Sequence, residues 1–92
     1  MPLTQRVTFK TMLQRGNRIQ VPKRVRWQFK MDSEQVLKVS VNVVRLFTLG
    51  WENFYAQMGE DGRITVPRLQ RALLNREQSL EGYVMDVILE PA

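Results

Sequence analysis

One short segment occurs twice in this chain of 92 residues, and this internal repeat restricts the fold more than any other feature. The stretch GNRIQVPKRVR at 16–26 is echoed by DGRITVPRLQR at 61–71, and the matching residues recur at a constant offset of 45. Apolar residues at alternate positions flank both copies, which is the pattern of half-buried β-strands. A chance motif would not bring its flanking pattern along, so we interpret the chain as two diverged copies of one unit.

Each copy predicts a strand, a tight turn, a short second strand, a short helix and a closing strand. Asn17 and Gly62 occupy equivalent turn positions, and both residue types tolerate the positive φ that a tight hairpin needs. Pro22 and Pro67 favour the first position of a helix and keep the preceding valine extended. The predicted first strands are 7–13 and 54–58, the helices are 23–29 and 68–74, and the closing strands carry Leu37, Val39, Val41 and Val43 or Tyr83, Met85, Val87 and Leu89.

The repeat is least regular in the helices and between the copies. Val25 and Phe29 form an i, i+4 apolar pair in copy one, whereas Leu69 and Leu73 form such a pair in copy two. The two helices are therefore expected to differ by one position in the face that they bury. The apolar residues change from odd-numbered to even-numbered positions at 43–44, which predicts a bulge or bend between the copies.

Each unit alone would leave sheet edges and one apolar face uncovered, so the two units are expected to fold together. We predict one domain over 1–92, with repeats at about 5–44 and 51–90. The predicted fold is mainly β, a closed six-stranded barrel made of two ββαβ repeats with pseudo-two-fold symmetry. Because the tandem chain supplies its own partner, we expect a monomer.

The residue types that are missing restrict the chemistry. The chain has no cysteine and no histidine, which excludes disulfides, thiolate chemistry and Ser-His-Asp or Cys-His catalysis within it. The adjacent carboxylates Glu60 and Asp61 lie in a predicted turn, without a partner base or a phosphate-binding loop. We therefore expect no enzymatic activity, no cofactor and no metal site. The apolar runs are too short to span a membrane and follow no signal pattern, so we expect an intracellular, cytoplasmic protein.

Positive charge is concentrated in the first half of the chain. The net charge is +5, to which residues 1–46 contribute +8 and residues 47–92 contribute −3. Eight basic residues and no acidic residue lie within 6–30, and such a block attracts a polyanion such as nucleic acid. A solvated basic face is an equally good interpretation of the same block. We interpret a set of cations as specific to copy one, so that one face alone meets the polyanion: Arg15, Lys23, Arg24 and Lys30.

Two aromatic residues lie among these cations. The run KRVRWQFK at 23–30 interleaves Trp27 and Phe29 with four basic residues. This composition is compatible with base stacking against single-stranded nucleic acid. Core packing is the favoured use of both rings, with Phe29 beside Val25 and Trp27 over the end of the barrel.

The duplicated pattern resembles the AbrB and MazE group of cradle-loop barrels. Their unit has the same hairpin, a G-R-[IV]-x-[IV]-P-x-x-[LV]-R stretch and a closing strand, and the resemblance covers nearly the whole chain, twice. It implies a cradle-loop barrel, and the presence of both copies in one chain favours a RIFT-type or related six-stranded barrel over a swapped-hairpin dimer. AbrB-like proteins are dimeric DNA-binding transcription factors, so the resemblance also implies DNA binding.

The resemblance also points to individual arginines. The hairpin arginine of the family falls on Arg18 and Arg63, and the first arginine of its helical pair falls on Arg26 and Arg71. An arginine at a barrel rim can contact phosphate, but it can equally cap a loop or pair with a carboxylate. The chain departs from the family at the other arginine positions, which fall on Trp27, Ala72, Thr11 and Ala56.

We therefore predict a non-catalytic nucleic-acid-binding protein, with DNA favoured over RNA. The rival hypothesis is a protein-interaction or adaptor barrel whose basic face meets an acidic protein. The candidate binding residues are Arg15, Arg18, Lys23, Arg24, Arg26, Lys30, Arg63 and Arg71.

Overall fold

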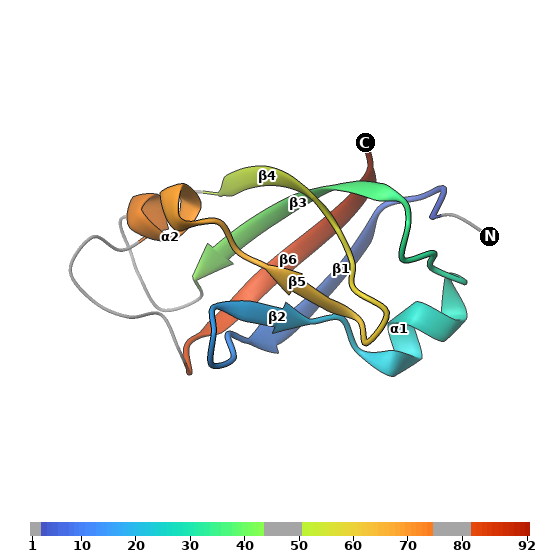
Figure 1. The fold of residues 1–92 in the computed structure, drawn as a ribbon, viewed down its shortest axis with the longest axis horizontal. Coiled ribbons are helices and arrows are strands. Elements are labelled where there is room, and N and C mark those ends of the chain that lie inside the picture. The colour runs from blue at the N-terminus through green and yellow to red at the C-terminus, as the bar shows by residue number, and fades with distance from the viewer. Residues whose placement is uncertain (1–2, 44–50, 75–81) are drawn as a thin grey trace.

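The computed structural model describes residues 3–43, 51–74 and 82–92 of the chain. Along these ranges the order strand, strand, helix, strand occurs twice (Figure 1). The predicted bend at 43–44 reaches beyond the described residues. The elements are β1 (Val7–Met12), β2 (Arg18–Gln20), α1 (Lys23–Gln28), β3 (Val36–Val43), β4 (Glu52–Gln57), β5 (Arg63–Thr65), α2 (Arg68–Leu74) and β6 (Val84–Pro91).

The observed turns and helix starts follow from the residue types that predicted them. Asn17 has a φ of 59° and Gly62 a φ of 84°, so both equivalent turn positions lie in the left-handed region. Each helix begins directly after its proline, so the prolines stand one position before the predicted first helical position, and Pro22 has the extended ψ of 139° expected there. The predicted elements are thus confirmed. β1, α1 and β4 end one residue earlier than predicted, and β4 also begins two residues earlier.

The strands pair in two antiparallel sheets. The larger sheet has the order β1-β6-β3-β4, and the smaller one pairs β2 with β5. Figure 1 shows the pair β2·β5, here called the ribbon, crossing in front of the larger sheet, with α1 and α2 at opposite ends of the molecule. The predicted mainly β fold is confirmed at this level, and the observed sheets are antiparallel.

The predicted single closed barrel is not formed by the strand pairing of the described residues. The ribbon strands have only three residues each, and both lead into a proline, which cannot donate to a further ladder. Within the described residues, each ribbon strand is hydrogen-bonded toward the larger sheet at its hairpin, where the Gln14 and Gly59 N–H groups donate to the Arg18 and Arg63 carbonyls, both at 2.8 Å. The two sheets are therefore linked at their corners.

Equivalent residues of the two copies lie opposite each other in both sheets. Ile19 is opposite Ile64 in the ribbon, and Val41 is opposite Val87 in the larger sheet. In both pairs the partners are each other's counterparts in the sequence repeat. Each copy therefore pairs with the other through the middle of β2·β5 and of β3·β6.

The register in which β1 pairs with β6 differs by two residues from the register in which β4 pairs with β3. Phe9 of β1 lies opposite Val87, whereas its counterpart Phe54 lies opposite Val39 rather than Val41. A shift by two keeps each side chain on the same face of the sheet, because side chains alternate with a period of two. Both copies can therefore bury the same face despite the shift.

The core lies between the ribbon and the larger sheet. The residues predicted to face inward from the closing strands are buried there, apart from Tyr83, which is half-buried and packs against the core. This confirms the alternation on which the strand predictions rest. The buried apolar residues are Leu3, Val7, Leu13, Ile19, Val21, Val25, Leu37, Val39, Val41, Val43, Phe54, Met58, Ile64, Val66, Met85, Val87 and Leu89.

The prediction for the buried face of the second helix is wrong. In α1, Val25 is buried and Phe29 packs against the core as predicted. In α2, Leu69 is 65% and Leu73 45% exposed. Both helices have the same orientation, so Gln70 occupies in α2 the inward position that Val25 occupies in α1. The Gln70 Nε2 donates to the backbone of β4 at 3.1 Å.

Candidate nucleic-acid interface

The hairpin arginines of the two copies share the outward face of the ribbon. Ile19 and Ile64 point inward and are fully buried, so their neighbours along each strand point outward. Arg18 and Arg63 are both exposed and lie at opposite ends of the ribbon. The ribbon therefore presents one cation near each of its ends.

Arg63 is held by neighbouring polar groups. Its Nη1 lies 3.6 Å from the Asp61 Oδ2, and its Nε donates to the Gln20 Oε1 at 3.4 Å. The Gln20 Nε2 in turn donates to the Asp61 carbonyl at 2.7 Å. The charge of Arg63 is thus partly balanced within the protein.

The first turns of α1 carry a group of exposed side chains. Lys23, Arg24 and Trp27 lie on the outer side of the helix, since Val25 faces the core. The Lys23 Nζ lies 4.6 Å from the centroid of the Trp27 ring, which is a cation–π contact. Lys30 follows the helix, is exposed and has a φ of 50°.

The prediction that Trp27 covers the end of a barrel is wrong. The residue is 70% exposed. Successive residues of an α-helix are turned by about 100°, so a side chain two positions after the buried Val25 points to the opposite side. Phe29, four positions after Val25, returns to the core side as predicted.

The helical arginines pack against backbone instead of projecting into solvent. Arg26 is half-buried and lies over Gly62, where a Cβ would be only 2.6 Å from its Nε. That Nε is buried without a hydrogen-bond partner. The Arg71 Nε donates to the Val66 carbonyl at 3.1 Å. Both side chains support the junction between a helix and the neighbouring loops or hairpin.

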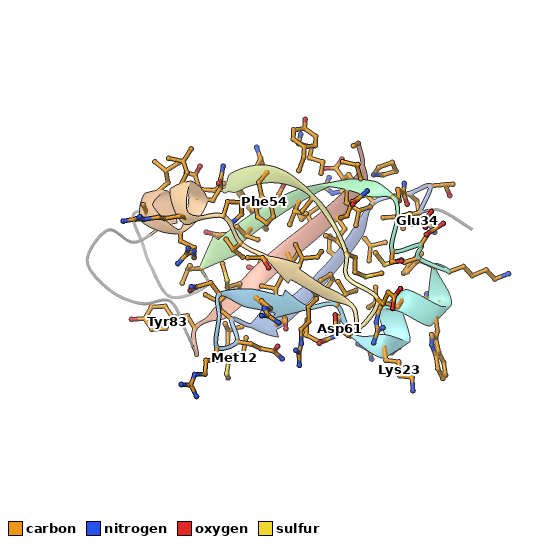
Figure 2. The ribbon with its side chains drawn as sticks, viewed as in Figure 1. Met12, Lys23, Glu34, Phe54, Asp61 and Tyr83 are labelled. Atoms are coloured by element: carbon orange, nitrogen blue, oxygen red, sulfur yellow. The ribbon has the colours of Figure 1, made fainter. Side chains whose placement is uncertain are left out.

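The structure divides the predicted binding residues between the two ends of the ribbon. The α1 end is marked by Lys23 and Asp61 in Figure 2, and Met12, where β1 ends before the first hairpin, lies toward the other end. The α1 end holds Lys23, Arg24, Arg26, Lys30 and Arg63, whereas the other end holds Arg15, Arg18 and Arg71.

Arg68 is an exposed cation that was not among the predicted binding residues. Arg68 begins α2 and is exposed, as Lys23 is at the start of α1. The constant offset of 45 pairs these two positions, so the repeat itself contained the signal. Lys23 is therefore not specific to copy one, and both ends of the ribbon have a cation at the start of the helix.

The described residues contain no group of three or more Asp or Glu side chains placed to hold a metal ion. Within the same ranges, no helix combines the length and apolar character needed to cross a membrane.

Comparison with known proteins identifies a structural relative but no family. No protein-family model matches the chain, and no curated protein matches it either. Among solved structures, the chain is similar to the solution structure of PHS018 from Pyrococcus horikoshii, with a TM-score of 0.78 and 21% sequence identity. The match covers 99% of this chain and 92% of the other. The chain therefore shares the fold of PHS018 over almost its whole length.

Proposed function

We propose that this protein binds nucleic acid through phosphate contacts made by exposed cations on the ribbon and on α1. The observation that carries the proposal is that five of the eight candidate residues are exposed and form no ion pair with any described carboxylate. Cations of this kind can replace the counterions of a phosphate backbone, and the release of those counterions favours binding. The five residues are Arg15, Arg18, Lys23, Arg24 and Lys30.

We also infer that the two sheets together make a cradle-loop barrel of the RIFT type. The inference is supported by the pairing of equivalent strands across the copies, β2 with β5 and β3 with β6. It is also supported by the hairpin bonds that link the ribbon to the larger sheet. Such a barrel fits the resemblance to AbrB and MazE.

Salt-dependent titration tests the proposed binding. Labelled duplex DNA, single-stranded DNA and RNA are titrated with the whole chain at several salt concentrations, and the variants Arg18→Gln and Arg24→Gln are compared. For duplex DNA, each lost phosphate contact is expected to lower the slope of log K against log salt by about 0.9 and to weaken binding several-fold.

Lys10→Gln is the matched control. It removes the same charge from the outer face of β1, where the Lys10 Nζ lies 3.8 Å from the Asp86 Oδ1. It is expected to leave the slope almost unchanged. If Lys10→Gln weakens binding as much as Arg18→Gln does, or if none of the three nucleic acids binds at low salt, the proposal is wrong. An acidic protein partner for the same cations is then the alternative.

We propose that the chain is a monomer. The two copies already pair with each other within one chain, with Ile19 opposite Ile64 and Val41 opposite Val87. Light scattering at micromolar concentration is expected to give the mass of one chain. Twice that mass would instead indicate pairing between chains.

A further inference from the structure

Trp27 is the most exposed large apolar side chain of the described residues. It is 70% exposed, on the face of α1 opposite the buried Val25. The indole ring thus lies in solvent, whereas Phe29, two positions later, packs against the core. A ring on the surface offers a flat apolar face to a partner.

One cation contacts this ring, and two more lie close to it along the chain. Lys23 contacts it at 4.6 Å, and Arg24 lies three positions before it, on the neighbouring turn of the same helix face. Lys30 follows the helix, and α1 itself contains no acidic residue. We call Lys23, Arg24, Trp27 and Lys30 the α1 cluster.

The second copy shows that this combination is not a requirement of the fold. At the positions of Arg24 and Trp27, α2 has Leu69 and Ala72, which are exposed as well. The same helix face is therefore apolar and uncharged at these positions in one copy, and cationic and aromatic in the other.

We propose that the α1 cluster binds single-stranded nucleic acid, with an unpaired base stacked on Trp27 and the neighbouring cations on the phosphates. The proposal rests on the proposed nucleic-acid binding and names the form of nucleic acid. In a duplex the base faces are covered by their neighbours, so only an unpaired base can stack on an indole. Exposed aromatic rings beside a cationic track are the usual means of binding a single strand without regard to sequence. The neighbouring cations supply positive charge for the phosphates of such a strand.

The affinity for single strands tests the stacking. The full chain and the variants Trp27→Ala and Trp27→Phe are titrated with labelled oligo-dT, oligo-U and duplex DNA at one salt concentration. Trp27→Ala is expected to weaken binding of the single strands about 5- to 150-fold, the range for the loss of one base stack, and to leave duplex binding nearly unchanged. Trp27→Phe is expected to retain most of the affinity. Comparing oligo-dT with oligo-U distinguishes DNA from RNA as the preferred strand.

Tyr55→Ala is the matched control, because Tyr55 is an aromatic residue of β4 that is 65% exposed. It lies outside the α1 cluster and is expected to leave binding of the single strands unchanged. In a Trp51→Phe background, Trp27 is the only tryptophan, and its fluorescence is expected to be quenched by oligo-dT or oligo-U but not by the duplex.

The outcomes separate this proposal from the general one. If Trp27→Ala leaves single-strand affinity unchanged, or weakens duplex and single-strand binding equally, stacking on Trp27 is refuted. The proposed function still stands in that case if Arg18→Gln and Arg24→Gln reduce binding. If neither oligonucleotide nor duplex binds the unmodified chain, both proposals fail.

Discussion

Replacing Ile64 with alanine is expected to lower the free energy of unfolding by about 2–5 kcal/mol, since this is the range for truncating a fully buried isoleucine. Ile64 is fully buried in the ribbon and lies opposite Ile19, which is equally buried. The pair forms the middle of the ribbon, where the two copies meet, and both side chains point into the core. Truncation removes buried apolar area and leaves a cavity that three-residue strands joined to prolines have little freedom to close.

The loss is measured by urea unfolding followed by circular dichroism. Ile19→Ala is expected to cost a similar amount because it occupies the equivalent position, and the two losses are not expected to add, since the side chains are cross-strand neighbours. Val84→Ala is the matched control, a β-branched residue of β6 that is 41% exposed, for which we expect a much smaller loss. Equal losses for Ile64→Ala and Val84→Ala would contradict the placement of the core.

Replacing Gly62 with alanine is the second change with a large expected effect. Gly62 has a φ of +84°, which costs an L-residue about 1–2 kcal/mol. An added Cβ would also lie 2.6 to 2.8 Å from the Nε, Cζ and Cδ of Arg26. Arg26 would have to move aside, and because these atoms lie at the end of a flexible side chain, the contact adds less than the ~1–3 kcal/mol typical of an overpacked core. We therefore expect Gly62→Ala to destabilise the protein by more than the backbone strain alone.

Two other glycines separate the strain from the contact. Gly16 and Gly82 both have a φ of +83°, but a Cβ at Gly16 has its nearest neighbour at 3.6 Å, and at Gly82 nothing lies within 4 Å. Gly16→Ala and Gly82→Ala are expected to show the strain alone. In an Arg26→Ala background, the loss from Gly62→Ala should fall to the same level. If Gly62→Ala costs less than Gly82→Ala in the unmodified chain, the left-handed turn at Gly62 is not formed in solution.

Much of the fold was predictable from the sequence because it depends on local rules. The alternation of Val39, Val41 and Val43 predicted a strand with one buried face, and those residues are buried. The shared turn position of Asn17 and Gly62 predicted two tight hairpins, and both residues have a positive φ. Such patterns need only neighbouring residues to be read.

The orientation of the second helix was not predictable in this way. Leu69 and Leu73 form a good apolar pair at helical spacing, yet both are exposed. The face that α2 buries is set by its attachment to β5 and by Gln70 bonding to β4. An apolar pair indicates that a helix can bury a face, but tertiary contacts determine which face it buries.

For the candidate site, the sequence identified the cations but not their surroundings. Arg18, Arg26 and Arg63 have the same charge and belong to the same repeated stretch. In the structure the first is exposed, the second packs on Gly62 and the third pairs with Asp61. An arginine's neighbours come from the other copy or from a turn, so their identity depends on how the two copies meet.

The internal repeat by itself determined the order of the elements, the inward faces of the strands and the residues of the turns, because each of these depends on spacing along the chain. Only the tertiary structure decided that the strands pair as β1-β6-β3-β4 and β2-β5, since hydrogen bonds between distant strands leave no mark in local periodicity. It also decided that Trp27 lies in solvent beside Lys23. The exposure of a ring depends on which face of its helix packs against the core. In α1 that face carries Val25 and Phe29, and Trp27 points away from it.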